Sequence, residues 1–307
     1  MKYLIVTAMI CAAQPAAAFD RMLLGDCQAS FERLADLVGP DDTQTPVRLR
    51  SISATFDGWC KIDGGAPGFE DVEFDTFIWR AEETSRWVNG GIPPLGLQLR
   101  ITGLDPDSME NSPPTNRPPV TVDATLRQDP AAGQVILEQV VMANDAGDRV
   151  TLSGVFDRVF LSSPSMMQVS VGSAVFKAGL MSLTLDGTHQ NPFGAEFSGN
   201  FNVDGNLREG DVFSTISSLP DGVIDDASRA ELTAFAEDLP KPVGTLDIVI
   251  GSERGLGLMQ VGAAMYNLAT YAAGDSTSGN SGGRELGILF DGITVSADWA
   301  PRDGQTD

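Results

Sequence analysis

Residues 279–283, Gly-Asn-Ser-Gly-Gly, contain a candidate nucleophilic serine, because this string is similar to the serine loop of trypsin-like proteases. Such a serine needs a histidine base within hydrogen-bond reach of its hydroxyl. The chain has one histidine, His189, which lacks the upstream position and the alanine and cysteine neighbours of the protease histidine. We therefore expect a polar loop at 279–283 and an exposed loop histidine at 189. One histidine also excludes a multi-histidine metal centre.

Four oxygen-bearing side chains fall within seven residues of a loop-like stretch: Asp105, Asp107, Glu110 and Asn111. Hard cations such as Ca²⁺ prefer carboxylate and amide oxygens. The spacing lacks the glycine and the terminal glutamate of an EF-hand. Asp105, Asp107 and Glu110 are therefore a candidate metal site, and an ordinary solvated loop explains the same residues.

Other catalytic arrangements have no local signature. Paired carboxylates can hydrolyse sugars, but nothing localises such a pair among the 42 acidic residues. Gly255 and Gly257 lack the third glycine of a dinucleotide fingerprint. We expect no catalytic residues and no cofactor, and a non-enzymatic protein is favoured; a carboxylate-based hydrolase is the remaining enzymatic alternative.

The first 18 residues have the pattern of a secretory signal peptide. Lys2 provides the positive start, residues 4–13 are apolar, Pro15 breaks the helix, and three alanines end the segment. The alternative is an uncleaved anchor, but the apolar run is shorter than the about 20 residues that span a bilayer. We expect cleavage after Ala18, a periplasmic location and no transmembrane span in the mature chain.

The mature chain then keeps two cysteines, Cys27 and Cys60. In an oxidising compartment an even pair is most simply a disulfide. In the chain-entropy model such a loop closure stabilises the fold by about 3–4 kcal/mol.

The chain is strongly acidic. Loss of Lys2 leaves 19 basic against 42 acidic residues, a net charge of −23. This charge repels nucleic acid and anionic lipid head groups at long range, so nucleic acid is not an expected partner. The acidic residues are dispersed along the chain, which is also the pattern of an ordinary solvated surface.

Hydrophobic spacing predicts the elements of residues 19–104. Leu24, Cys27, Phe31, Leu34 and Val38 lie at helical spacing, and Gly39-Pro40 ends that helix. Alternation from Val47 to Phe56 predicts a strand with a bulge near residues 50–51. Residues 69–87 begin as a strand and end as a short helix, and residues 95–101 alternate as another strand. Cys27 lies on the apolar stripe of the first helix, from which it can reach Cys60.

Residues 103–119 contain five prolines, which can continue neither a helix nor a central strand. We expect a surface loop there and a division into units 19–104 and 120–300, with residues 301–307 as a polar tail.

Period-two alternation dominates residues 120–203. The intervening positions are mostly polar, which is typical of an antiparallel sheet with one wet face. The alternating sets are Val120, Val122, Ala124 and Leu126; Val150, Leu152, Phe156 and Phe160; Met167, Val169, Val171 and Val175; Met181, Leu183 and Leu185; and Ala195, Phe197, Phe201 and Val203.

The later chain mixes helices and strands. Asp225 or Asp226 can cap a helix whose Leu232, Phe235 and Leu239 face inward. The uncharged residues 255–274 predict a half-buried helix on the apolar face of the sheet, and 286–290 and 293–299 predict a last strand pair. The expected fold is mainly β (α+β): an antiparallel meander sheet with one apolar face covered by a few helices.

Residues 180–205, LMSLTLDGTHQNPFGAEFSGNFNVDG, repeat an apolar-x-apolar-x-Gly hairpin pattern. This stretch resembles the meanders of AsmA-like envelope proteins, which carry long curved sheets with an apolar concave side. Those proteins usually keep an N-terminal membrane helix, whereas this signal looks cleavable. The resemblance implies lipid handling or envelope assembly, with acyl chains on the apolar face.

A one-sided sheet must bury its apolar surface against a helix, a lipid or another protein. The sequence therefore predicts a non-enzymatic periplasmic protein that binds a hydrophobic ligand or an envelope partner. The alternative is a structural or interaction protein with a closed core. The candidate ligand-contact residues are Leu258, Met259, Met265, Met181 and Leu183.

Overall fold

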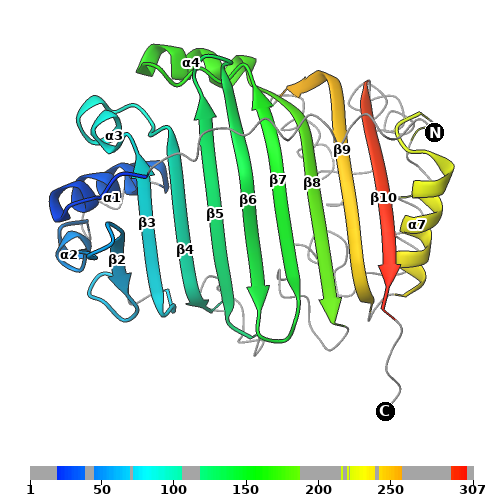
Figure 1. Cartoon of the computed structure of the whole chain (residues 1–307), viewed down its shortest axis with the longest axis horizontal. Helices are drawn as coiled ribbons and strands as arrows, with labels where there is room; N and C mark the ends of the chain where they lie inside the picture. The colour runs from blue at the N-terminus through cyan, green and yellow to red at the C-terminus, as the bar shows by residue number, and fades with distance from the viewer. Residues whose placement is uncertain are drawn as a thin grey trace, which may run out of the picture.

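A computed structural model of the chain describes residues 19–38, 45–69, 72–105, 118–186, 222–238, 242–257 and 292–302, together with Ile216 and Pro220. These residues form a ten-stranded sheet in which every strand pairs antiparallel with its neighbour in sequence, from β1 at one edge to β10 at the other (Figure 1). This meander confirms the expected fold class.

Five helices are described beside the sheet, and none of them is long and apolar enough to cross a membrane. They are α1 (Leu24–Val38), α2 (Thr45–Arg50), α3 (Thr84–Gly90), α4 (Pro164–Ser173) and α7 (Asp226–Glu237). The strands are β1 (Ser53–Ala54), β2 (Cys60–Asp63), β3 (Thr76–Glu82), β4 (Gly96–Leu104), β5 (Val120–Asp129), β6 (Gln134–Asn144), β7 (Arg149–Asp157), β8 (Val175–Asp186), β9 (Val243–Gly257) and β10 (Ile293–Pro301).

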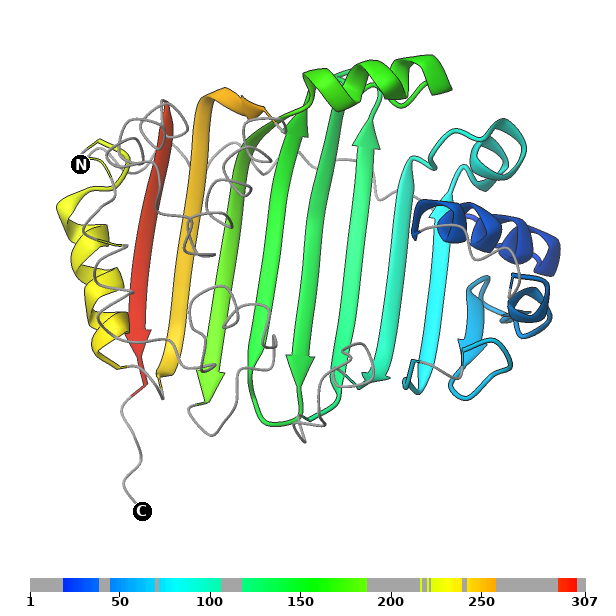
Figure 2. The same ribbon diagram turned by 180° about the vertical axis from the view of Figure 1, so that it is seen from behind.

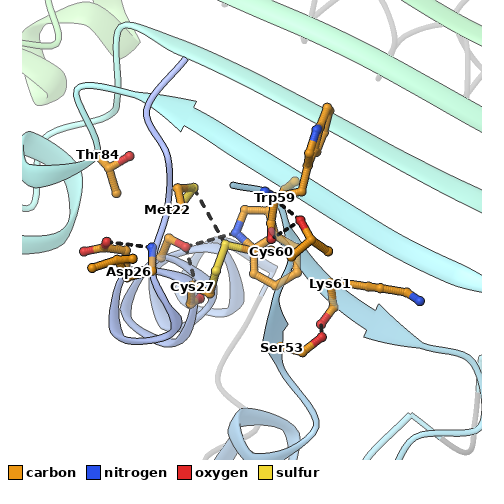
Figure 3. The surroundings of a disulfide bond; sticks show 12 residues. Met22, Asp26, Cys27, Ser53, Trp59, Cys60, Lys61 and Thr84 are labelled. Carbon is orange, nitrogen blue, oxygen red and sulfur yellow. Dashed lines mark hydrogen bonds between the residues drawn. A yellow bond between two sulfur atoms is a disulfide. The ribbon is translucent and has the colours of Figure 1, made fainter. Parts of the chain in front are cut away.

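A buried hydrophobic core lies where α1 packs on β2 and β3. The predicted disulfide is present: Cys27 of α1 and Cys60 of β2 are joined with an S–S distance of 2.02 Å, and both are buried (Figure 3). Trp79 of β3 lies beneath α1, where its indole N–H donates to Ser30 Oγ at 3.0 Å. Its ring centroid lies 5.9 Å from that of Phe31. The disulfide therefore joins α1 to the sheet inside this core.

The strand predicted from Val47 to Phe56 is wrong for most of its length. Residues Thr45–Arg50 form α2, and only Ser53–Ala54 are extended. Proline at the second position favours a helix start, because the first helical N–H groups have no internal partner. From this helix Leu49 packs against the buried core. Phe56 lies in the turn after β1, where it is 90% exposed.

The alternation of Met167, Val169, Val171 and Val175 predicted one strand. Only Val175 lies in a strand, at the start of β8, and the prediction is wrong for the other three residues. These residues belong to α4, whose cap is Ser163: its Oγ accepts a hydrogen bond from the Met166 N–H at 3.3 Å. Serine followed by proline is a helix-start signal, and its local hydrogen bonds outweigh the alternation. Phe160 likewise lies outside β7, and β6 was not predicted at all.

The predicted helix near residue 226 is confirmed as α7, with Asp225 as its cap. The predicted strand 293–299 lies in β10. The helix predicted over 255–274 is wrong at its start, because β9 continues to Gly257 in pairing with Val175 of β8. The remainder of that segment, the predicted strands at 195–203 and 286–290, Leu239, the signal peptide and the polar tail beyond Arg302 lie outside the described residues.

The strands that flank the expected domain boundary, β4 and β5, pair directly with each other. The expected units 19–104 and 120–300 therefore contribute strands to one sheet.

The β10 edge of the sheet is covered by the segment that leads into α7. The Val295 N–H donates to the Val223 carbonyl at 2.7 Å, and the Trp299 N–H donates to Glu231 Oε2 at 3.3 Å. The indole N–H of Trp299 donates to Asp238 Oδ2 at 2.8 Å, and its ring contacts Phe235. Open edges can pair with another chain, and these contacts occupy backbone donors of β10 that would otherwise be available.

Candidate ligand-binding face

The strand register assigns each side chain to one of two faces, because alternate residues of a strand point to opposite sides. One continuous row of paired residues crosses the sheet from β3 to β10 and lies on a single face. It comprises Trp79, Leu99, Ala124, Val140, Leu152, Met181, Ile248 and Ala297. We call the side of the sheet that carries this row the apolar face.

The paired positions of the apolar face on β4–β8, and on β9 as far as Ile250, carry no charged side chain. Three features of the register produce this result. Residues alternate between the two faces along the strands, and bulges in β6 and β8 return the aliphatic residues beyond them to the apolar face. Cross-strand pairs also match aliphatic with aliphatic residues. The positions are Leu97, Leu99, Ile101, Val122, Ala124, Leu126, Val135, Leu137, Val140, Met142, Val150, Leu152, Gly154, Phe156, Phe176, Gly179, Met181, Leu183, Leu185, Leu246, Ile248 and Ile250.

The opposite face, called the polar face, carries hydrogen bonds and ion pairs between neighbouring strands, together with hydrophobic residues such as Val141, Leu180 and Val249. Arg100 pairs with Asp123 across β4 and β5. Arg127 contacts Glu138 at 2.7 Å and Glu82 at 3.4 Å. Ion pairs at a protein surface contribute little stability, about 0–1 kcal/mol each. They leave the polar face compatible with water, so the apolar face is the side of the sheet that needs a cover.

Burial is uneven along the apolar face. The described cluster of buried hydrophobic residues lies at the β2–β3 end, under α1. Farther along, Leu152, Met181 and Leu183 are only half-buried, whereas Ala124, Val150 and Leu246 on the same face are buried. In Figures 1 and 2, α1 lies at one end of the sheet, α7 lies beside β10, and no described helix crosses the middle of β5–β8. The described helices thus cover the two ends of the sheet rather than the centre of this face.

An aromatic pair borders the apolar face on the side of α4. Phe156 and Phe176 are cross-strand partners with edge-to-face rings 5.7 Å apart. The Phe176 ring lies over two paired glycines, Gly154 and Gly179. A Cβ atom on Gly179 would lie 2.8 Å from Phe176 Cζ, so the glycine makes room for the ring.

Two predicted ligand-contact residues, Met181 and Leu183, lie next to each other on the apolar face of β8. Met181 pairs with Leu152 on one side and with Ile248 on the other. Leu183 pairs with Val150 and with Leu246. The other predicted contacts, Leu258, Met259 and Met265, lie outside the described residues.

The candidate metal site is described at one residue only. Asp105 follows β4, and its backbone N–H donates to the Glu73 carbonyl at 2.8 Å. Asp107, Glu110 and Asn111 lie outside the described residues, as do His189 and the serine loop at 279–283. Within the described ranges, no group of three or more His, Cys, Asp or Glu side chains is arranged to hold a metal ion.

Sequence reasoning missed an aromatic cage on the polar face. The Arg80 guanidinium lies 4.6 Å from the ring centroid of Phe19 and 4.3 Å from that of Trp59, and its Nε donates to Gln98 Oε1 at 2.7 Å. Desolvation lowers the pKa of Arg80 from its ordinary value, and the charge of Asp57 opposes this shift. Phe19, Arg80 and Trp59 are distant in sequence, so only the fold brings them together.

Comparison with protein-family models, with curated proteins and with solved structures found no match to this chain.

Proposed function

We propose that this protein is a non-enzymatic periplasmic module that binds a hydrophobic ligand on the apolar face of its sheet, centred on β5–β9. The observation that supports the proposal is the continuous uncharged surface from β4 to β9, whose central side chains Leu152, Met181 and Leu183 are half-buried. The periplasmic location follows from the signal-peptide pattern, and the resemblance to AsmA-like meanders favours a lipid as the ligand. An envelope protein that covers the same face is the other form of this proposal.

The energetics favour a long aliphatic ligand. Each methylene group transferred from water contributes about 0.8 kcal/mol, and association offsets several kcal/mol of that gain. A ligand with a small apolar part therefore binds weakly to a surface without polar anchors. A chain of about ten or more methylene groups gains enough to remain bound during purification.

The test is mass spectrometry of an organic extract of the protein, purified from the periplasm without detergent. We expect a phospholipid or another hydrophobe at a stoichiometric amount. The Met181→Asp variant places a charge on the apolar face and should lose the ligand, whereas Ser182→Asp places the same charge on the polar face and should keep it. A clean extract from stably folded wild-type protein would contradict the carrier proposal and favour a closed core or a protein partner.

A further inference from the structure

Residues 19–22, which we call the N-terminal strap, precede α1 and have no regular secondary structure, yet they make specific contacts along their length. The Asp20 N–H donates to the Ala81 carbonyl of β3 at 3.0 Å, and the Met22 N–H donates to the Gly58 carbonyl at 3.2 Å. Arg21 lies against Gly58, where a Cβ atom would be 2.7 Å from Arg21 Cα. The strap therefore connects β3 to the turn between β1 and β2.

The side chain of Asp20 caps α3 from outside the helix. Its Oδ2 accepts a hydrogen bond from the Thr84 N–H at 2.7 Å. Glu83, at the N-cap position of α3, makes no side-chain capping bond of its own. The first N–H groups of a helix have no acceptor within the helix, so they need one from elsewhere. Asp20 supplies this acceptor, and the strap and the start of α3 thereby hold each other in place.

Met22 places the strap directly on the disulfide. Met22 is 1% exposed, and its Sδ lies 3.7 Å from the Sγ of Cys60 (Figure 3). Both cysteines are fully buried. Apart from Met22 and Ile52, the buried members of this core lie in helices or strands: Cys27, Phe31, Cys60, Ile62, Trp79, Ala81 and Trp87. The strap can therefore leave the disulfide without breaking a strand pair or unwinding a helix.

A buried disulfide is reduced only when a thiolate reaches one of its sulfur atoms. Local opening of a short segment requires less free energy than unfolding of the whole domain, and chain ends open most easily. In the mature chain expected from cleavage after Ala18, the strap is such an end. Its withdrawal is therefore the path of lowest free energy to the Cys60 Sγ.

We propose that the N-terminal strap controls the access of thiols to the Cys27–Cys60 disulfide. Withdrawal of residues 19–22 exposes Cys60 Sγ while the sheet stays folded. A thiolate of dithiothreitol then bonds to Cys60 Sγ, and the electron pair of the broken S–S bond leaves on Cys27 as a thiolate. The second thiolate of the reductant attacks the reductant's own sulfur in this mixed disulfide and releases Cys60 as a thiolate. Dithiothreitol is thereby oxidised by two electrons to its cyclic disulfide, and its two thiol protons are replaced by those that the cysteine thiolates take up from water.

The experiment measures how fast dithiothreitol reduces the purified mature protein. Iodoacetamide alkylates the new thiols, and mass spectrometry determines the reduced fraction over a series of urea concentrations below the unfolding midpoint. A reaction that requires global unfolding accelerates steeply with urea, because unfolding exposes a large surface. Opening of the strap exposes little surface, so we expect a rate that is nearly independent of urea until the midpoint is approached. A rate with the full urea dependence of global unfolding at every concentration would overturn the proposal.

Two capping aspartates give a matched pair of variants. Asp20 holds the strap on α3, whereas Asp225 accepts a hydrogen bond from the Ser228 N–H at 2.8 Å at the start of α7. Both aspartates are exposed, so neither Asp→Ala substitution leaves a cavity in the core. Asp20→Ala should raise the reduction rate at low urea about fivefold, which is the usual effect of losing a helix cap. Asp225→Ala should leave that rate unchanged, and equal acceleration in the two variants would contradict control by the strap.

The cover that Met22 provides is tested by the size of its side chain. Met22→Leu keeps an apolar side chain of similar volume and should be reduced at the wild-type rate. Met22→Ala uncovers Cys60 and should be reduced about tenfold faster or more at low urea. Ile62→Ala is the control for the cavity, because Ile62 is equally buried in the same core but lies in β2. It should lower the urea midpoint without changing the rate at low urea, and an Ile62→Ala rate as fast as that of Met22→Ala would overturn the proposal.

Discussion

Met181 and Ser182 are consecutive residues of β8, yet they lie on opposite faces of the sheet. Met181 is paired with Leu152 and Ile248, whereas Ser182 is paired with Thr151 and Asp247. A single position along the strand thus separates an aliphatic environment from a polar one. This relationship makes the two residues a matched pair for testing which face binds a ligand.

We predict that Met181→Asp abolishes the recovery of a hydrophobic ligand, while Ser182→Asp retains it. The aspartate at 181 would have to be desolvated by the bound chain, and an unpaired charge in an apolar environment costs several kcal/mol. The aspartate at 182 stays in water. The measurement is the molar ratio of extracted lipid to protein for each variant. Equal ratios in the two variants would place any ligand elsewhere on the molecule.

The faces of this sheet were predictable from sequence, because alternation in β4, β5, β7 and β8 follows the pleat directly. The bulges were not. Two consecutive residues of β6, Glu138 and Gln139, are both exposed at a register shift. The parity changes at this point, so β6 does not present a simple alternating pattern. A bulge is fixed by the partner strands, and a single sequence does not specify its partners.

The candidate site was predictable in part for the same reason. Met181 and Leu183 alternate with Ser182 and Thr184, so their common face follows from local geometry. The cage of Phe19 and Trp59 around Arg80 depends on tertiary contacts that have no spacing signature. The error at α4 has another cause: the valines and methionines at 166–171 fit both periodicities, and the Ser163–Pro164 start signal was the evidence that favoured the helix.

We predict that replacing both cysteines, Cys27→Ala with Cys60→Ala, lowers the free energy of unfolding by about 3–4 kcal/mol. The bond joins residues separated by 33 positions, so its loss returns considerable conformational freedom to the unfolded chain. Urea denaturation of the variant and of the wild type, with and without reductant, measures the difference. If the reductant still lowers the stability of the double variant, the loss of stability under reductant does not come from the Cys27–Cys60 disulfide.

The capping carboxylate of Asp225 gives a pH dependence of known sign. Its pKa is lowered from its usual value, first by the hydrogen bond from the Ser228 backbone N–H at 2.8 Å and then by the Ser228 side chain. A carboxyl group whose pKa is lower in the folded state stabilises the fold at neutral pH, and this stabilisation is lost as the pH falls through the folded-state pKa. We predict that Asp225→Asn keeps a cap but flattens the loss of stability below the usual aspartate range. Urea midpoints measured from pH 7 down to strongly acidic pH test this, and parallel curves would contradict it.

Arg80→Lys should destabilise the N-terminal segment, although it preserves the charge. The planar guanidinium lies against both Phe19 and Trp59 while its Nε donates to Gln98, and an ammonium group cannot reproduce this combination. We expect a loss of about 1 kcal/mol in unfolding free energy, together with a change in Trp59 fluorescence. Arg100→Lys is the matched control, because Arg100 lies on the same face of the next strand and forms an exposed ion pair with Asp123. That variant should change stability by less than about 0.5 kcal/mol. Similar losses for both arginines would mean that charge on the polar face, rather than the aromatic cage, stabilises this part of the sheet.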